Sequence, residues 1–181
     1  MNTLVKIVVS TLIILVLGSC SSEQSLQQYY VQGTEDPNFL VVDIPASMLN
    51  LSESELSTDQ KEAYQSLGKL NILAYRLDPA KRSQYEAEKI KVNEILKNEK
   101  YEELMRFSSG EARGVVKFIG DDESIDELIL FGSYKDMGFA VVRVLGDEMK
   151  PENMMQLVKA VESSQINTDG FGQLKDFFES K

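Results

Sequence analysis

The chain has 181 residues, a mass of 20.4 kDa and a formal net charge of -10, from 19 Lys and Arg residues against 29 Asp and Glu residues. It contains no His and one Cys, which excludes catalytic arrangements with an imidazole base, His-rich metal sites, thiolate zinc clusters and a disulfide within the chain. The excess of carboxylates argues against general nucleic-acid binding, because Lys and Arg supply the charge that neutralises phosphates.

The N-terminal residues are typical of a bacterial export signal. Residues 7–17 form a largely apolar stretch that is too short to cross about 30 Å of hydrocarbon as a helix. The four residues that follow resemble the lipobox of bacterial lipoproteins, in the order Leu17, Gly18, Ser19 and Cys20. We therefore expect residues 1–19 to be a lipoprotein signal peptide, with cleavage before Cys20 and a lipid on this residue that makes a membrane its partner.

Two alternatives stay open for this segment. In the first alternative, the chain is an ordinary secreted protein and Cys20 follows the signal by chance. In the second, the chain keeps the apolar segment as a membrane anchor. Several acyl chains on one residue give lasting anchorage, because each buried methylene contributes about 0.8 kcal/mol. Ser21, rather than Asp, after the Cys favours the outer membrane by analogy with other Gram-negative lipoproteins.

Residues 20–37 are polar and lack a sustained apolar period. We expect the lipidated Cys to be followed here by a flexible tether. Tyr29, Tyr30 and Val31 are the exception and indicate a short ordered start to the domain. A single domain is then expected over residues 38–164.

The domain begins with a strand and a helix. A run rich in β-branched residues at 39–44, closed by Pro45, predicts a strand. Ser57 and Gln60 have the spacing of a capping box. This spacing predicts a helix whose apolar side carries Ala63, Tyr64, Leu67 and Leu70.

The second half of the domain is dominated by strands. Residues 71–77 predict a strand, and Asp78 followed by Pro79 marks the start of a helix that runs to about residue 97. The apolar period then changes to two in four segments with short connections, at residues 102–107, 112–119, 125–131 and 139–145. Such short connections permit only antiparallel neighbours, so the four segments predict a meander, and Pro151 opens a last helix of the domain.

This order predicts an α+β fold. We expect a mostly antiparallel sheet of about six strands, ending in the four-strand meander, with helices packed on one face.

Several strand segments resemble the Bacteroidetes envelope family catalogued as domain of unknown function 4252. The segments that carry the resemblance are residues 101–105, 116–119, 125–130 and 141–147, with residues 41–45, 73–75 and the basic helix in corresponding order upstream. The resemblance covers roughly residues 37–163. It implies the fold and the lineage, and it implies an exported protein, because members commonly carry signal peptides. It implies no activity and no catalytic residue.

The densest group of carboxylates lies in the connection between two meander strands. Its candidate ligands for a cation such as calcium are Asp121, Asp122, Glu123 and Asp126. Their spacing does not match the D-x-[DN]-x-[DN]-G loop of calcium sites. A solvated turn that discourages edge pairing is the better interpretation.

Residues 165–181 form an amphipathic tail. Its apolar side chains fall on one side of a short helix after Gly170, and they are Phe171, Leu174, Phe177 and Phe178. Such a helix can dock onto its own domain, fill a groove of a partner protein or contact the bilayer. We treat these four residues as candidates for partner binding.

Charge is unevenly distributed along the chain. Residues 81–106 carry a net charge of +1, whereas residues 120–181 carry -7. The less negative flank is a candidate for contact with anionic headgroups or a partner, although many of its charges have the spacing of pairs that support a helix surface.

No residues form a recognisable catalytic motif. Glu102 and Glu103 are neighbours along a predicted strand and point to opposite faces. Asp43 is either a buried acid or, as we favour, the exposed end of a strand. No phosphate-binding glycine motif is present, so no cofactor is expected.

These observations together predict a lipid-anchored protein of the cell envelope that is not an enzyme and that acts by binding or scaffolding, with an envelope protein as a possible partner. A sensory or regulatory lipoprotein that signals to a membrane partner is the alternative. An envelope enzyme with a His-free site is a third hypothesis.

Overall fold

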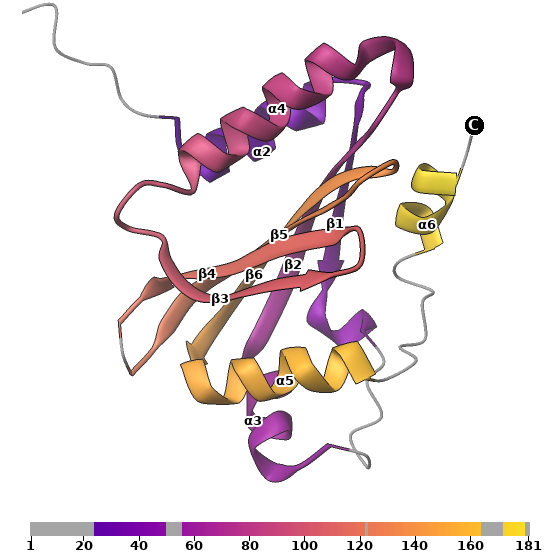
Figure 1. Cartoon of the computed structure of the whole chain (residues 1–181). Helices are drawn as coiled ribbons and strands as arrows, with labels where there is room; N and C mark the ends of the chain where they lie inside the picture. The colour runs from indigo at the N-terminus through magenta and orange to yellow at the C-terminus, as the bar shows by residue number, and fades with distance from the viewer. Residues whose placement is uncertain (1–23, 50–55, 122, 164–171, 180–181) are drawn as a thin grey trace, which may run out of the picture.

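The computed structural model describes residues 24–49, 56–121, 123–163 and 172–179, and within these residues six strands form one antiparallel sheet (Figure 1). The strands are β1 (Phe39–Pro45), β2 (Leu67–Arg76), β3 (Glu102–Ser109), β4 (Ala112–Gly120), β5 (Ile125–Tyr134) and β6 (Gly138–Met149). Their order in the sheet is β1-β2-β6-β5-β4-β3. The predicted α+β class and the meander from β3 to β6 are both confirmed.

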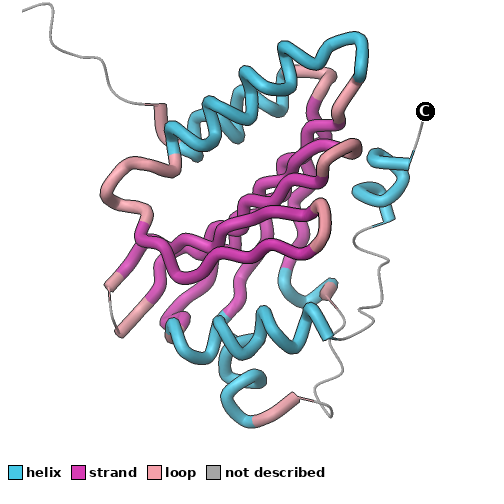
Figure 2. Tube along the Cα trace, viewed as in Figure 1, coloured by secondary structure: helices cyan, strands magenta, loops and turns pink. Residues whose placement is uncertain are grey.

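Helices cover both faces of this sheet (Figures 1 and 2). They are α2 (Leu26–Glu35), α3 (Thr58–Ser66), α4 (Arg82–Ile95), α5 (Pro151–Ser163) and α6 (Gly172–Glu179), with short 3-10 turns η1 (Ala46–Met48) and η3 (Pro79–Lys81). Residues of α2 and α4 belong to one apolar core, and residues of α3 and α5 belong to the other.

The prediction that helices pack on one face is therefore wrong. Central strands of this sheet are apolar on both sides, so both sides need a cover. Ile72 and Leu73 are neighbours on β2 that point to opposite faces, and each is 1% exposed.

Most of the segment expected to be a tether is a helix. α2 begins at a capping box in which the Ser25 side chain accepts from the Gln28 backbone and the Gln28 side chain accepts from the Ser25 backbone. Its buried residues recur at the spacing of one helix face, and they are Leu26, Tyr29, Tyr30 and Gly33. A flexible tether over residues 20–37 is thus wrong for residues 26–35, except at residues 29–31, where a short ordered start to the domain was expected.

The boundary between α3 and β2 also differs from expectation. The capping box of Ser57 and Gln60 is present, as predicted, but the helix ends at Ser66. Leu67 and Leu70, which we placed on the helix, belong to β2 and pair with β6. Strand pairing outweighs the local helical pattern here, because β2 is hydrogen-bonded on both sides by β1 and β6.

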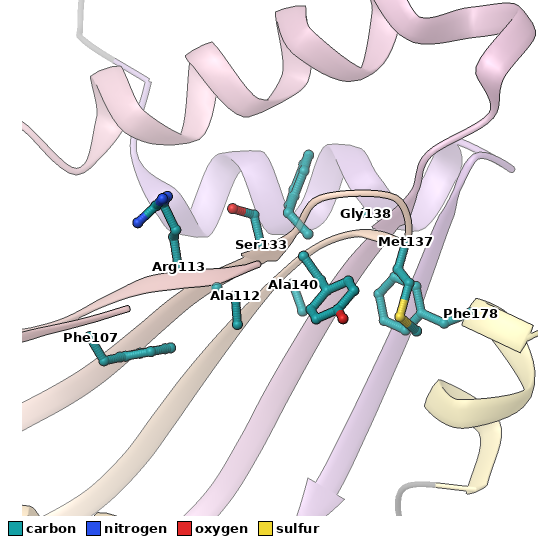
Figure 3. A pocket seen from close by; sticks show the side chains of 11 residues that line it. Phe107, Ala112, Arg113, Ser133, Met137, Gly138, Ala140 and Phe178 are labelled. Atoms are coloured by element: carbon teal, nitrogen blue, oxygen red, sulfur yellow. The ribbon is translucent and has the colours of Figure 1, made fainter. Parts of the chain in front are cut away.

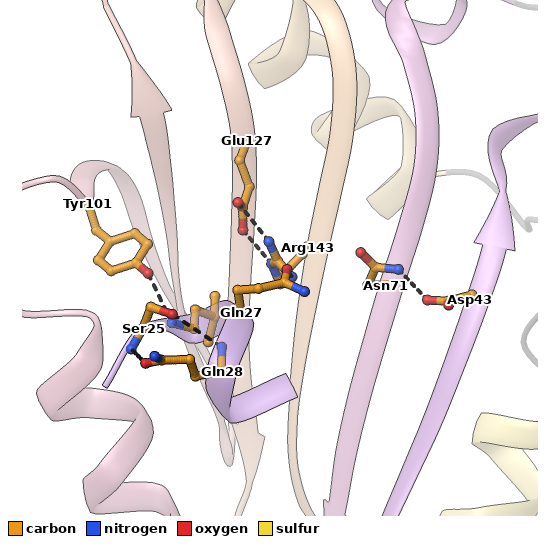
Figure 4. A network of polar contacts seen from close by, with 9 residues as sticks. Ser25, Gln27, Gln28, Asp43, Asn71, Tyr101, Glu127 and Arg143 are labelled. Atoms are coloured by element: carbon orange, nitrogen blue, oxygen red, sulfur yellow. Dashed lines mark hydrogen bonds and ion pairs between the residues drawn. The ribbon is translucent and has the colours of Figure 1, made fainter. Parts of the chain in front are cut away.

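A buried ion pair lies beneath α2 (Figure 4). Arg143 of β6 donates from Nε to Glu127 Oε1 at 2.6 Å and from Nη2 to Glu127 Oε2 at 3.0 Å. The two side chains are 6% and 12% exposed. Arg143 Nη1 also donates to the side-chain oxygen of Gln27 on α2, so the helix contributes to the solvation of the buried cation.

Tyrosine hydroxyls tie α2 to its other neighbours. The Tyr30 hydroxyl donates to Asp43 of β1 at 2.6 Å, and Asp43 also accepts from the side-chain amide of Asn71 on β2. Tyr29 donates to Glu88 of α4 at 2.9 Å. Burial raises the pKa of Tyr29 and Tyr30 above the ordinary tyrosine value, so both hydroxyls stay protonated and keep these bonds. Asp43 is exposed by area, as favoured, although its carboxylate is engaged.

Removing one member of the buried pair should destabilise the fold strongly. Glu127→Leu leaves the Arg143 guanidinium buried without its carboxylate, and we expect the free energy of unfolding to fall by about 3–5 kcal/mol. The double variant Glu127→Leu with Arg143→Met should recover most of this loss, since no charge is left buried. Urea unfolding of the three proteins measures both values, and a double variant no more stable than Glu127→Leu would contradict the explanation.

Candidate functional site

An apolar hollow of about 280 Å³ lies where the β5–β6 hairpin meets α6 (Figure 3). Its main lining residues are Phe107, Gly132, Tyr134, Met137, Ala140 and Phe178. We call this feature the aromatic hollow. It is open to solvent and almost entirely hydrocarbon in its lining, so it can remove an apolar group from water but offers that group few polar contacts.

Gly132 and Ala140 line the aromatic hollow, and Gly114 lies in register with them on the adjacent strand, under the Phe107 ring. Gly114 of β4 pairs with Gly132 of β5, and Gly132 pairs with Ala140 of β6. The Phe107 ring from edge strand β3 lies over Gly114, where an added Cβ would be 2.0 Å from the ring carbon Cζ. At Gly132 an added Cβ would meet no atom closer than 3.9 Å. The small residues therefore seat one aromatic ring and leave open space beside it.

The opposite rim carries exposed apolar side chains. Tyr134 and Met137 are 44% and 38% exposed, and both lie in the β5–β6 hairpin. The hairpin closes through Gly138, whose φ of 146° suits glycine and whose added Cβ would lie 2.1 Å from the Tyr75 carbonyl oxygen. Exposed apolar residues beside a hollow are characteristic of binding surfaces.

Two of the four tail candidates contact the domain itself. Phe178 of α6 lines the aromatic hollow, and its Cε1 would be 3.0 Å from a Cβ at Gly138. Arg76 of β2 donates from Nη1 to the Phe177 carbonyl oxygen at 3.1 Å, and its guanidinium lies 5.5 Å from the centre of the Phe177 ring. Phe171 and the side chain of Leu174 lie outside the described residues.

The acidic connection between β4 and β5 is held by its own carboxylate. Asp121 Oδ1 accepts from the backbone nitrogens of Glu123 and Ser124 at 2.9 and 2.8 Å, and these bonds lower the pKa of Asp121. This carboxylate stabilises the turn. Glu123 and Asp126 are exposed, and Asp122 lies outside the described residues.

The candidate lipidation site, Cys20, lies outside the described residues, as do the lipobox residues Leu17, Gly18 and Ser19. In the part of the chain that the structure does describe, no helix has the length and apolar character needed to cross a membrane.

Residue patterns alone did not single out most of the aromatic hollow. Phe107, Tyr134 and Met137 were apolar residues near strand ends, and Gly114 and Gly132 were glycines that weaken strand patterns. The available signal was a glycine inside each of two consecutive strands, Gly114 and Gly132. A glycine inside a strand indicates that another group approaches the backbone closely.

Comparison with known proteins gives one match. The model of a family described as Domain of unknown function (DUF4252) matches residues 29–157. No curated protein and no solved structure matches the chain. The matched residues include α2 from Tyr29 onward and the whole sheet, whereas α6 lies beyond them.

Gly114 and Gly132 should respond differently to one added methyl group. In Gly114→Ala the Phe107 ring must leave its position, and we expect a loss of about 1–3 kcal/mol in the free energy of unfolding. Gly132→Ala should be neutral or slightly stabilising, because its methyl enters open space. Urea unfolding measures the difference, and equal effects at both positions would refute the described packing of Phe107.

Proposed function

The chain belongs to the DUF4252 family, and from this premise we propose that it is a lipid-anchored protein of the bacterial cell envelope, placed in the outer membrane, that binds a protein partner at the aromatic hollow. It acts by binding and not by catalysis. The observation that carries the binding role is the apolar lining between Phe107 and the exposed rim at Tyr134 and Met137.

The chemistry of the partner follows from the residue that already reaches the hollow. α6 presents the Phe178 ring to it while Arg76 holds the preceding carbonyl oxygen. A partner segment with an aromatic side chain and an accessible backbone carbonyl would make the same contacts. Burial of one such ring contributes about 1.5–3 kcal/mol, which is enough to orient a partner but requires further contacts for tight binding.

A regulatory role is the second candidate function. It is supported by the position of α6, which lies beyond the family match and contributes Phe178 to the hollow. A partner that uses the same contacts competes with the tail, so binding and release of α6 are coupled. In this role the exposed tail carries the signal to another envelope component.

The proposed lipid anchor is tested by replacing the sulfur atom of Cys20. The wild-type protein should fractionate with membranes and, by mass spectrometry, should begin at an acylated Cys20. Cys20→Ser should remove the acyl groups and release the protein from the membrane fraction, because the sulfur that accepts the diacylglyceryl group is absent. If the variant and the wild type have the same mature mass and the same distribution, the anchor is refuted.

Binding at the aromatic hollow is tested with the tail as a defined probe. The full chain with Phe178→Ala, whose hollow lacks its own ring, should bind a labelled peptide of residues 172–181 more tightly than the wild-type chain does. The same peptide with Phe178→Ala should bind roughly tenfold to a hundredfold more weakly, the equivalent of burying one ring. Fluorescence anisotropy measures both affinities.

Substitutions at Gly132 give the matched control for this measurement. Gly132→Leu, added to the Phe178→Ala chain, fills the open space and should abolish peptide binding, while Gly132→Ala should preserve it. If the peptide's affinity changes neither with Phe178→Ala in the peptide nor with Gly132→Leu in the chain, the aromatic hollow is not the binding site.

A further inference from the structure

The described chain starts beside the C-terminal end of α4. Gln24 and Ser25 share a hollow of about 340 Å³ with Ile90 of α4 and with Lys100 and Tyr101, which follow α4. The first backbone nitrogen of α2, on Leu26, donates to the Tyr101 hydroxyl at 3.2 Å. The start of α2 is therefore fixed to this end of the domain.

The length of chain between this point and the proposed lipid is small. Four peptide units join Cys20 to Gln24, and at about 3.3–3.6 Å per residue they span at most about 14 Å in any conformation. A tether that ran to residue 37 would span up to about 60 Å and would leave the domain free to turn. Because α2 starts at Leu26, the α2–α4 end of the domain has to stay close to the lipid headgroups.

The side chains at this end suit a lipid interface. Ile90 is exposed on 58% of its surface, and the exposed residues Lys91 and Lys100 line the same hollow. Glu94 lines it too, and the exposed Lys97 pairs with Glu94. Lys91 and Lys97 pair with Glu88 and Glu94 at 2.5 and 2.7 Å. The Lys97–Glu94 pair is exposed and contributes little energy, so the Lys97 stem can lie along apolar surface while its ammonium group reaches phosphates. The Glu88 side chain is 17% exposed and also accepts from the Tyr29 hydroxyl, so Lys91 is held at the edge of this surface.

We propose that Ile90, Lys91, Lys97 and Lys100 form the membrane-facing surface of the protein, seated on the phospholipid headgroups of the bilayer that holds the anchor. This inference rests on the proposed lipid at Cys20. It adds the orientation: α6 and the β5–β6 hairpin lie at the other side of the molecule from the start of α2 (Figure 1). β5 has ten residues, about 30 Å at about 3.3 Å each, so the aromatic hollow faces the aqueous space and its partner comes from there.

The test measures the distance of two labels from the headgroups in the intact lipidated protein. Cys20 carries the lipid, so a second Cys is the only free thiol and can carry a fluorophore. Lys97→Cys places it on the proposed surface, and Asp136→Cys places it in the β5–β6 hairpin as a control that is also exposed. Both proteins are reconstituted in vesicles of phosphatidylcholine and phosphatidylglycerol, with some phosphatidylcholine carrying a nitroxide on its headgroup.

We expect the nitroxide to quench the label at position 97 several-fold more strongly than the label at position 136. Equal quenching at the two positions in protein that floats with the vesicles would overturn the proposed surface, since the domain would then have no fixed orientation. Protein that does not float with the vesicles would instead refute the anchor itself. Cys20→Ser versions of both labelled chains should show no quenching.

Discussion

Within the described residues, the fold depends on how the buried guanidinium of Arg143 is paired. Arg143 lies in the centre of the sheet, where an unpaired guanidinium would be strongly destabilising. Glu127 supplies the charge, and Gln27 supplies an oxygen from a helix far away in the chain. Because α2 completes this arrangement, the helix is part of the domain core. The position of α2 then decides where the chain enters the domain. In the proposed lipid-anchored protein, it also decides how close the domain lies to the lipid and which end faces the water.

Local patterns predicted the sheet well because its turns are short and its strands alternate. The meander from β3 to β6 followed from a period of two between glycine-rich connections. α2 was missed because its composition is polar, although Leu26, Tyr29, Tyr30 and Gly33 have helical spacing and Ser25 with Gln28 forms a capping box. At α3 the opposite error occurred: Leu67 and Leu70 continue a helical pattern, but pairing with β6 takes them into β2. Non-local pairing of this kind is invisible in a window of ten residues.

The candidate site was predictable only in part for the same reason. The tail was singled out by its aromatic residues, and the structure places Phe177 and Phe178 against the domain. The surface that receives Phe178 depends on strand register, which aligns Gly114, Gly132 and Ala140 from three strands. No one of these residues is informative alone. The predicted lipobox is the reverse case, because the resemblance rests on four consecutive residues and needs no knowledge of the fold.

The sheet order also has a consequence for how the chain folds. β2 pairs with β6, so the backbone groups on one edge of residues 67–76 have no partner strand until residues 138–146 are in place. The meander contains only neighbouring hairpins, which close quickly. β2 and β6 are instead separated by more than sixty residues, which include α4 and the first three strands of the meander. β6 is therefore the strand that joins the β1–β2 pair to the meander. Until β6 forms, the second edge of β2 is unpaired, and an unpaired apolar edge is prone to pair with another chain and aggregate.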